Sequence, residues 1–191
     1  MKDVFLVAAA TVGLISYLPY IIDTIKGRTK PRIVTWFNWS LLTALATAAA
    51  YSDKQYPSAV ITLVDTILNM AIVFLSLRYG VKELGFFDVA CQVGAITGFV
   101  LWIIFNRPLI AIIAAVGIDF MAALPTIKHA WQKPREETAV TFILSVIAAG
   151  LTLLATHRPH LSGILWPIYI ICMDGFISVL LLERAKPTIS A

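Results

Sequence analysis

The sequence predicts an all-α integral membrane protein with seven transmembrane helices, arranged as two parallel three-helix bundles joined by a linker helix. Three observations predict this fold class: a composition that is 59% hydrophobic and only 14% charged, seven apolar stretches of spanning length, and a motif that occurs twice. A soluble domain needs about a quarter charged residues to cover its surface. The composition therefore excludes an ordinary soluble protein.

Seven apolar stretches, separated by short loops, are each close to the ~20 residues with which a helix crosses a ~30 Å hydrocarbon layer. We predict one transmembrane helix for each stretch. The first stretch has no small-residue cleavage site, so we expect a retained helix rather than a signal peptide. The stretches cover residues 4–25, 33–51, 57–78, 86–105, 108–131, 138–156 and 161–182.

Basic residues are concentrated in the loops after the first, third and fifth stretches and after the seventh. By the positive-inside rule these regions face the cytoplasm, which places the N-terminus outside and the C-terminus inside. Trp36 and Trp131 fall near this inner interface, and the brevity of the chain favours a prokaryotic inner (plasma) membrane. The inner set is Lys26, Arg28, Lys30, Arg32, Arg78, Lys82, Lys128, Lys133, Arg135, Arg184 and Lys186, and the outer set is Lys2, Lys54, Arg107 and Arg158.

One motif occurs twice at a constant spacing: a Leu-Pro pair, then a basic loop, then Val-Thr and an aromatic residue. Both copies carry the basic loop on the same side of the membrane, so the two units are parallel. Three-helix units joined directly would be antiparallel, and one extra span must therefore lie between them. The matched positions are Leu18, Pro19, Ile21, Val34, Thr35 and Trp36 in the first copy and Leu124, Pro125, Ile127, Val140, Thr141 and Phe142 in the second.

Residues 88–105 have no counterpart in either copy and supply this extra span. The predicted organisation is a first triple-helix bundle over residues 1–80, linker helix 4 over 81–107, and a second triple-helix bundle over 108–191.

Three aspartates fall near the middle of predicted spans: Asp65, Asp119 and Asp174. Each costs about 2.5–3.5 kcal/mol at a helix centre, so such residues face the protein interior or water and are functional candidates. A desolvated aspartate binds a cation or takes up a proton, which makes all three candidates for proton coupling. The alternative is that they only hydrogen-bond to nearby hydroxyl groups and hold helices together.

Pro19 and Pro125 lie inside the first and fifth predicted helices. A proline in a helix interior removes one backbone hydrogen bond and clashes with the preceding turn, which produces a kink or a hinge. Asp119 stands six residues before Pro125, so a proton bound there would bias such a hinge.

The paired prolines, the basic loop and the start of the following helix resemble the SWEET and PQ-loop transporter superfamily. Tyr20 and Thr126 stand where that family carries the glutamine of its name. The resemblance implies a central pocket between the two bundles, with the prolines as pivots for alternating access. It also implies that the third and seventh helices bind substrate, a role carried here to Asp65 and Asp174.

Three further residues are candidates for the same pocket. Asn69 lies one turn beyond Asp65, and Trp39 shares a helix face with Trp36. Asn38 belongs to the run Trp-Phe-Asn-Trp, which is similar to a motif of the nicotinamide-riboside transporters.

These features favour a transporter that moves a small polar solute by alternating access, with proton coupling and a cationic or zwitterionic substrate such as an amino acid. The alternatives are a sugar or vitamin facilitator and a non-transporting binding protein that resembles the KDEL receptor. We expect no enzyme, because neither an HExxH nor a GxSxG motif is present.

The expected partners are a small-molecule substrate and the lipid bilayer, and formation of a homodimer stays open. Nucleic acid is not expected, because the basic residues fall in short loops. No cofactor and no metal site are expected, and Cys91 and Cys172 are expected to be packed thiols. Glu136 and Glu137 are expected to be solvated charges at a helix start.

Overall fold

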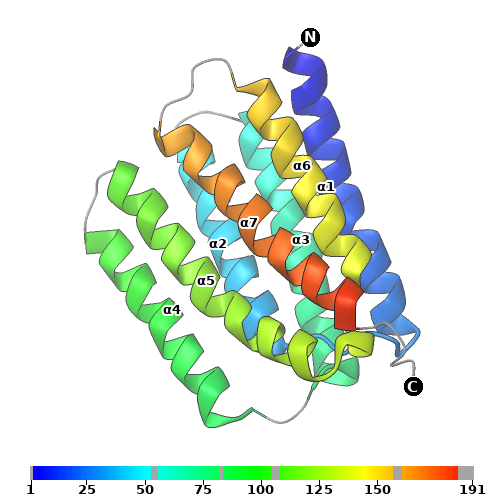
Figure 1. Ribbon diagram of the computed structural model, residues 1–191. Coiled ribbons are helices and arrows are strands. Elements are labelled where there is room, and N and C mark those ends of the chain that lie inside the picture. Colours follow the sequence, from blue (N-terminus) through cyan, green and yellow to red (C-terminus); the bar gives the residue numbers. More distant parts are fainter. Residues whose placement is uncertain (1, 53–55, 82–83, 105–107, 157–160, 185–191) are drawn as a thin grey trace. The chain divides into compact units, whose positions relative to one another are not determined.

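The computed structural model describes residues 2–52, 56–81, 84–104, 108–156 and 161–184, and within these ranges all regular structure is helical (Figure 1). The predictions that concern Lys54, Lys82, Arg107, Arg158 and Lys186 lie outside the described residues. The helices are α1 (Lys2–Ile25), α2 (Ile33–Ser52), α3 (Tyr56–Tyr79), α4 (Phe86–Ile104), α5 (Pro108–Gln132), the short 3₁₀ helix η1 (Pro134–Glu136), α6 (Ala139–Ala155) and α7 (Leu161–Arg184).

The seven α-helices confirm the seven predicted helices, and their ends agree with the apolar stretches to within two residues. Local signals explain the ends. Gly27 adopts a positive φ of 71° directly after α1, the conformation that commonly terminates helices. Pro108 occupies the first turn of α5, where its missing N–H has no helical partner in any case.

Four of the described helical segments are long and apolar enough to cross a membrane, namely Lys2–Ile25, Val60–Tyr79, Ile113–Gln132 and Ile164–Arg184. Shorter apolar segments are found in α2, α4 and α6. Length and composition therefore agree with an integral membrane protein, whereas the seven crossings and the 3+1+3 arrangement stay predictions.

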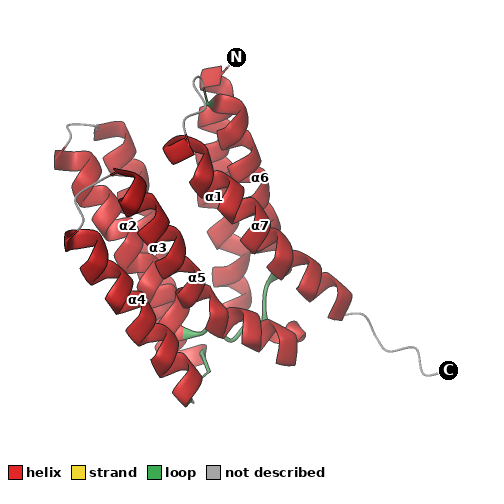
Figure 2. Ribbon diagram, turned by 60° about the vertical axis from the view of Figure 1, so that its left-hand side comes forward, coloured by secondary structure: helices red, strands yellow, loops and turns green. Residues whose placement is uncertain are grey.

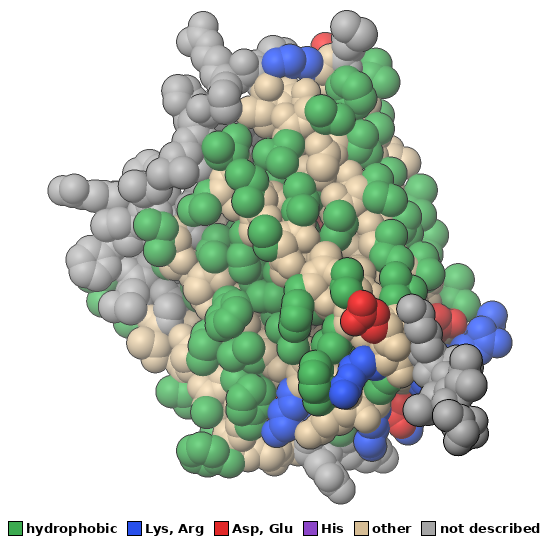
Figure 3. Space-filling model, in the orientation of Figure 1, with side chains coloured by type: hydrophobic (Ala, Val, Ile, Leu, Met, Phe, Trp, Pro, Cys, Tyr) green, Lys and Arg blue, Asp and Glu red, His purple; other side chains and the backbone are tan. Residues whose placement is uncertain are grey.

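The surface composition agrees with this class. Large apolar side chains such as Val4, Val7, Phe74 and Leu77 are exposed, and Figure 3 shows hydrophobic side chains over most of the visible face. Soluble monomers rarely expose such continuous apolar surface. Many serines, threonines and asparagines are buried instead, as in membrane helices, where polar and small residues lie at helix contacts.

Helix packing divides the chain into two compact units. The first unit consists of residues 1–30 and 127–191, and the second consists of residues 31–126. In the first unit α6 packs against both α1 and α7, and the three helices lie side by side in Figure 2. A Cβ added to Gly13 would lie 3.8 Å from the Ala148 Cβ, an ordinary van der Waals distance, so Gly13 of α1 lies opposite Ala148 of α6.

In the second unit α2 packs against α3 and α4. Leu42 and Leu45 of α2 also pack against a core formed by Ala95 of α4 and Ile118 of α5. The arrangement places α2 next to each of the other three helices of this unit.

Polar contacts fix α4 to α2 in addition to this apolar core. Arg32, just before α2, forms an ion pair with Asp88 in the first turn of α4. The side chains of this pair are only 13% and 4% exposed, respectively. Asp88 also accepts a hydrogen bond from the Gly85 N–H at 2.9 Å. The helix that was predicted only as a linker is therefore firmly packed in the second unit.

Each unit combines helices from both copies of the repeated motif. In the first unit α1, which carries the start of the first copy, packs against α6, which carries the end of the second copy. In the second unit α5, which carries the start of the second copy, packs with α2, which carries the end of the first copy. The first compact unit is therefore built from two separate segments of the chain. The division into residues 1–80, 81–107 and 108–191 stays a prediction.

Candidate functional site

A row of polar side chains lies between α2 and α3 in the second unit. The Thr47 hydroxyl donates to Thr62 Oγ1 at 3.0 Å, and the Thr66 hydroxyl donates to Thr43 Oγ1 at 3.1 Å. Asn69 Nδ2 reaches Thr43 Oγ1 at 3.5 Å. Because these residues repeat at helical spacing, they form one face of each helix. We call Thr43, Thr47, Thr62, Thr66 and Asn69 the polar seam.

Two buried atoms at this seam have no hydrogen-bond partner in the part of the chain that the structure describes: Nε1 of Trp39 and Oδ1 of Asn69. Both residues lie next to Thr43, whose hydroxyl contacts the Trp39 carbonyl oxygen at 3.0 Å as well as the Asn69 amide. A buried polar group without a partner costs about 1–3 kcal/mol. An open indole donor on α2 and an open amide acceptor on α3 are each suited to a polar ligand.

The ring of Trp39 is held by its neighbour on α2. Trp36 is 2% exposed, and the two ring centroids lie 4.9 Å apart at an interplanar angle of 82°. This edge-to-face geometry is a favourable one for aromatic pairs. The orientation of the open indole N–H is therefore set by packing.

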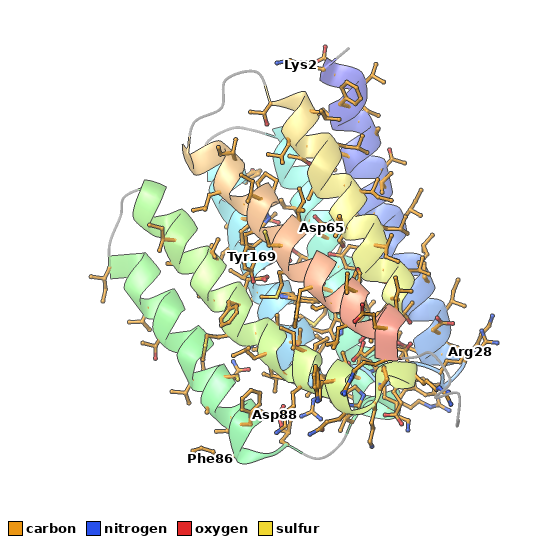
Figure 4. All side chains as sticks on the ribbon, viewed as in Figure 1. Lys2, Arg28, Asp65, Phe86, Asp88 and Tyr169 are labelled. Carbon is orange, nitrogen blue, oxygen red and sulfur yellow. The ribbon has the colours of Figure 1, made fainter. Side chains whose placement is uncertain are left out.

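Asp65 lies one turn before Asn69 on α3, near the middle of the helix (Figure 4). Residues spaced by four share a helix face, so the carboxylate belongs to the same side of α3 as the Asn69 amide. Of the predicted site residues, Asp65 and Asn69 thus share a face of α3, and Trp39 lies one turn before Thr43, whose hydroxyl the Asn69 amide reaches. Thr43 and Thr66 were missed, although threonines at a spacing of four in an apolar stretch were a usable signal.

Asn38 has partners within the protein. Its amide nitrogen donates to the Val34 carbonyl oxygen at 2.8 Å and to Gln92 Oε1 at 3.0 Å, and Gln92 Nε2 donates back to Asn38 Oδ1 at 3.1 Å. This reciprocal amide pair joins α2 to α4. Its substrate-binding role stays a prediction, and any ligand at Asn38 would have to displace Gln92.

Asp119 and Asp174 are buried, with exposed fractions of 5% and 8%. Asp119 follows the core residue Ile118 on α5, and Asp174 lies on α7, where its carbonyl oxygen accepts the Ser178 hydroxyl at 2.7 Å. Burial of both carboxylates agrees with the expectation that they avoid lipid. Their roles in substrate binding and proton coupling stay predictions.

The two predicted hinge prolines occupy different positions relative to the units. Both lie inside helices, Pro19 in α1 and Pro125 in α5. The boundary between the units falls between Thr126 and Ile127, directly after the Pro125 turn, whereas Pro19 lies within the first unit. The sequence did not distinguish the two prolines in this way.

The two copies of the motif meet in the first unit. The Tyr20 hydroxyl donates to Glu137 Oε2 at 2.9 Å, and the hydroxyl oxygens of Thr29 and Thr138 lie 2.5 Å apart. Thr138 also donates to Asp23 Oδ2 at 3.2 Å. Glu137 is 8% exposed, so the expectation of a solvated charge at this position is wrong. The Glu137 carboxylate is instead buried and accepts a hydrogen bond from the Tyr20 hydroxyl of α1.

Glu136 is held by two basic side chains. Lys30 Nζ lies 2.5 Å from Glu136 Oε1, and His129 Nε2 lies 3.3 Å from Glu136 Oε2. Burial raises the pKa of the Glu136 carboxyl, but the hydrogen bond from Lys30 and the charges of Lys133, Lys30 and His129 outweigh this effect. The pKa is therefore lowered from its usual value of 4.5.

This lowered pKa predicts a pH-dependent contribution to stability. A carboxyl whose pKa is lower in the folded than in the unfolded state stabilises the fold above its unfolded pKa, and the contribution is lost as the pH falls through the folded value. We therefore expect Glu136→Gln to melt below the wild type at neutral pH, with the gap closing as the pH falls below 4.5. Thermal unfolding across this range measures the gap. A gap independent of pH contradicts the prediction.

Comparison with known proteins finds no match: no family model, no curated protein and no solved structure is similar to this chain. The likeness to the SWEET and PQ-loop superfamily stays a resemblance carried by the motif, and the function must be argued from the site.

Proposed function

We propose that this protein is a membrane transporter that moves a small polar solute by alternating access, with the polar seam of the second unit as its binding site. The observation that carries the proposal is a pair of buried atoms without a hydrogen-bond partner among the described residues, Trp39 Nε1 and Asn69 Oδ1, on two residues that both contact Thr43 through other atoms. A protein that only needed to pack α2 against α3 would gain stability by pairing or replacing these atoms.

The chemistry of the seam favours a cationic or zwitterionic solute. Asp65 accepts a proton or binds an ammonium group, and Asn69 Oδ1 accepts a hydrogen bond from the same kind of group. The indole N–H of Trp39 only donates, so it suits a carboxylate or carbonyl oxygen. One donor on α2 and two acceptors on α3 together match the two ends of an amino acid.

Alternating access requires a place where the structure bends. Pro125 supports this role, because it lies inside α5 immediately before the boundary between the two units. Pro19 is the counterpart in α1. Proton uptake at Asp65, Asp119 or Asp174 is the proposed energy source, and the proposed orientation has the N-terminus outside a prokaryotic inner membrane and the C-terminus in the cytoplasm.

The test combines binding with uptake. Purified protein is screened by thermal unfolding against amino acids, sugars and vitamins, because a ligand that binds only the folded state raises the melting temperature. Hits are then followed as labelled solutes in proteoliposomes with and without a pH gradient. Binding without uptake would indicate a receptor. If no solute of any class raises the melting temperature of the folded protein, the proposal is refuted.

A matched pair of variants separates the site from the packing around it. Asn69→Leu is expected to weaken ligand binding about tenfold or more, the loss of one hydrogen bond to a charged group, with little change in the melting temperature without ligand. Asn38→Leu is expected to lower that melting temperature and to leave the affinity of the folded protein unchanged. Equal affinities for Asn69→Leu and the wild type would place the ligand elsewhere.

A further inference from the structure

The last turn of α5 carries an exposed tryptophan, Trp131, and Arg184 at the end of α7 stacks on its ring. The Arg184 guanidinium carbon lies 3.6 Å from the centroid of the Trp131 ring, and Arg184 Nη1 donates to the Trp131 carbonyl oxygen at 2.7 Å. Trp131 is itself 55% exposed. A stacked guanidinium keeps a fixed plane, which reduces the entropy lost when it binds a second group.

The surroundings of this pair are basic. Lys128, Lys133 and Arg135 lie within the end of α5 and η1 and are exposed, and Figure 3 shows Lys and Arg side chains grouped on the visible face where α7 ends. Glu183, next to Arg184 on α7, is the exposed acidic side chain in this neighbourhood among the described residues. The exposed charge around Trp131 is therefore predominantly positive.

The nearby carboxylates are directed to partners inside the first unit. Glu137 accepts the Tyr20 hydroxyl, Glu136 is paired with Lys30 and His129, and Asp23 accepts the Thr138 hydroxyl. These three carboxylates therefore have partners within the first unit.

We propose that Arg184 and Trp131 form a binding site for the phosphate group of an anionic phospholipid. Tryptophan is enriched at the level of the lipid headgroups, and basic clusters next to transmembrane helices attract anionic lipids. The planar fork of arginine matches two phosphate oxygens. This inference does not depend on the proposed transport function.

The test measures lipid binding to the full-length chain in detergent micelles. Native mass spectrometry with phosphatidylglycerol is expected to show retained lipid on the wild type, and phosphatidylcholine is expected to bind more weakly. Arg184→Gln is expected to lower phosphatidylglycerol affinity about fivefold, the loss typical of one basic residue near an anionic surface. Arg184→Lys keeps the charge but not the planar fork of the guanidinium. Its affinity for phosphatidylglycerol is expected to lie between those of the wild type and Arg184→Gln.

Arg28→Gln is the matched control, because it removes the charge of another arginine of the first unit, one that is 69% exposed and paired with Asp23. It is expected to bind phosphatidylglycerol nearly as well as the wild type. Trp131→Leu keeps every charge but removes the ring on which Arg184 stacks. It is expected to lower the affinity for phosphatidylglycerol.

Equal losses in Arg28→Gln and Arg184→Gln would overturn the proposal, since they would indicate only a diffuse charge effect. Displacement of the lipid by inorganic phosphate at equal concentration would also overturn it in favour of a free-anion site. If Arg184→Gln fails to fold, retention of lipid by a folded Trp131→Leu protein at wild-type affinity would refute the site.

Discussion

Replacing Gly80 with alanine is expected to destabilise the second unit by about 3 kcal/mol, the upper end of the cost of overpacking. A Cβ at this position would lie 2.5 Å from the Ser76 carbonyl oxygen and 2.6 Å from the Pro31 carbonyl oxygen. Both are backbone atoms, so no change of rotamer relieves the clash. The Pro31 oxygen also accepts the Val81 N–H at 3.3 Å, and that contact would be lost if the chain moved apart.

Gly117→Ala is the matched control for Gly80→Ala. Gly117 lies inside α5 of the same unit, and a Cβ added there meets nothing within 4 Å. Alanine is the better helix former by about 1 kcal/mol, so this variant is expected to melt slightly above the wild type. Thermal unfolding followed by tryptophan fluorescence in micelles measures both variants. A wild-type melting temperature for Gly80→Ala would contradict the close approach at this turn.

The second large effect concerns the Arg32–Asp88 ion pair between the starts of α2 and α4. Asp88→Ala is expected to cost about 3 kcal/mol, because it leaves the largely buried Arg32 guanidinium without its counter-charge. The side chains of the two residues are 13% and 4% exposed, respectively. The variant also removes the acceptor of the Gly85 N–H.

Two further variants serve as controls for Asp88→Ala, and the stability of each is measured by thermal unfolding. The double variant Arg32→Met with Asp88→Leu is expected to recover most of the stability, because apolar residues of similar size often replace a buried pair at little cost. Arg28→Ala breaks the exposed pair with Asp23, whose side chains are 69% and 28% exposed, respectively, and is expected to cost less than about 1 kcal/mol. A double variant less stable than Asp88→Ala would refute the account.

The helices were predictable because each is a long apolar run with a recognisable end. Gly27 follows the end of α1, Pro31 lies in the loop before α2, and Pro108 is the first residue of α5. These signals act within a few residues. The sequence therefore predicted where each helix begins and ends, with no need to know which helices touch.

The choice of packing partners was not predictable in this way. The repeat suggested bundles of consecutive helices, which stay a prediction, and it did not indicate the contacts of α1 with α6 and of α5 with α2. Hydropathy does not distinguish one apolar face of a helix from another, so it could not predict these contacts.

In the candidate site, too, individual residues could be recognised in the sequence, whereas contacts between residues far apart in the chain could not. Trp39, Asp65 and Asn69 stood out as polar or aromatic residues in apolar stretches, and Asn69 belongs to the polar seam between α2 and α3. The hydrogen-bonded pair of Asn38 on α2 and Gln92 on α4 could not be predicted from the sequence, because the two residues are 54 positions apart. The burial of Glu137 under Tyr20 was missed for the same reason.

The contact between α1 and α6 has a consequence for biogenesis. The ribosome releases α1 first, but its packing partner begins only at Ala139. The first unit can therefore be completed only after all of the second unit, residues 31–126, has been synthesised. A truncated product that stops before Ala139 would lack the helix against which α1 packs.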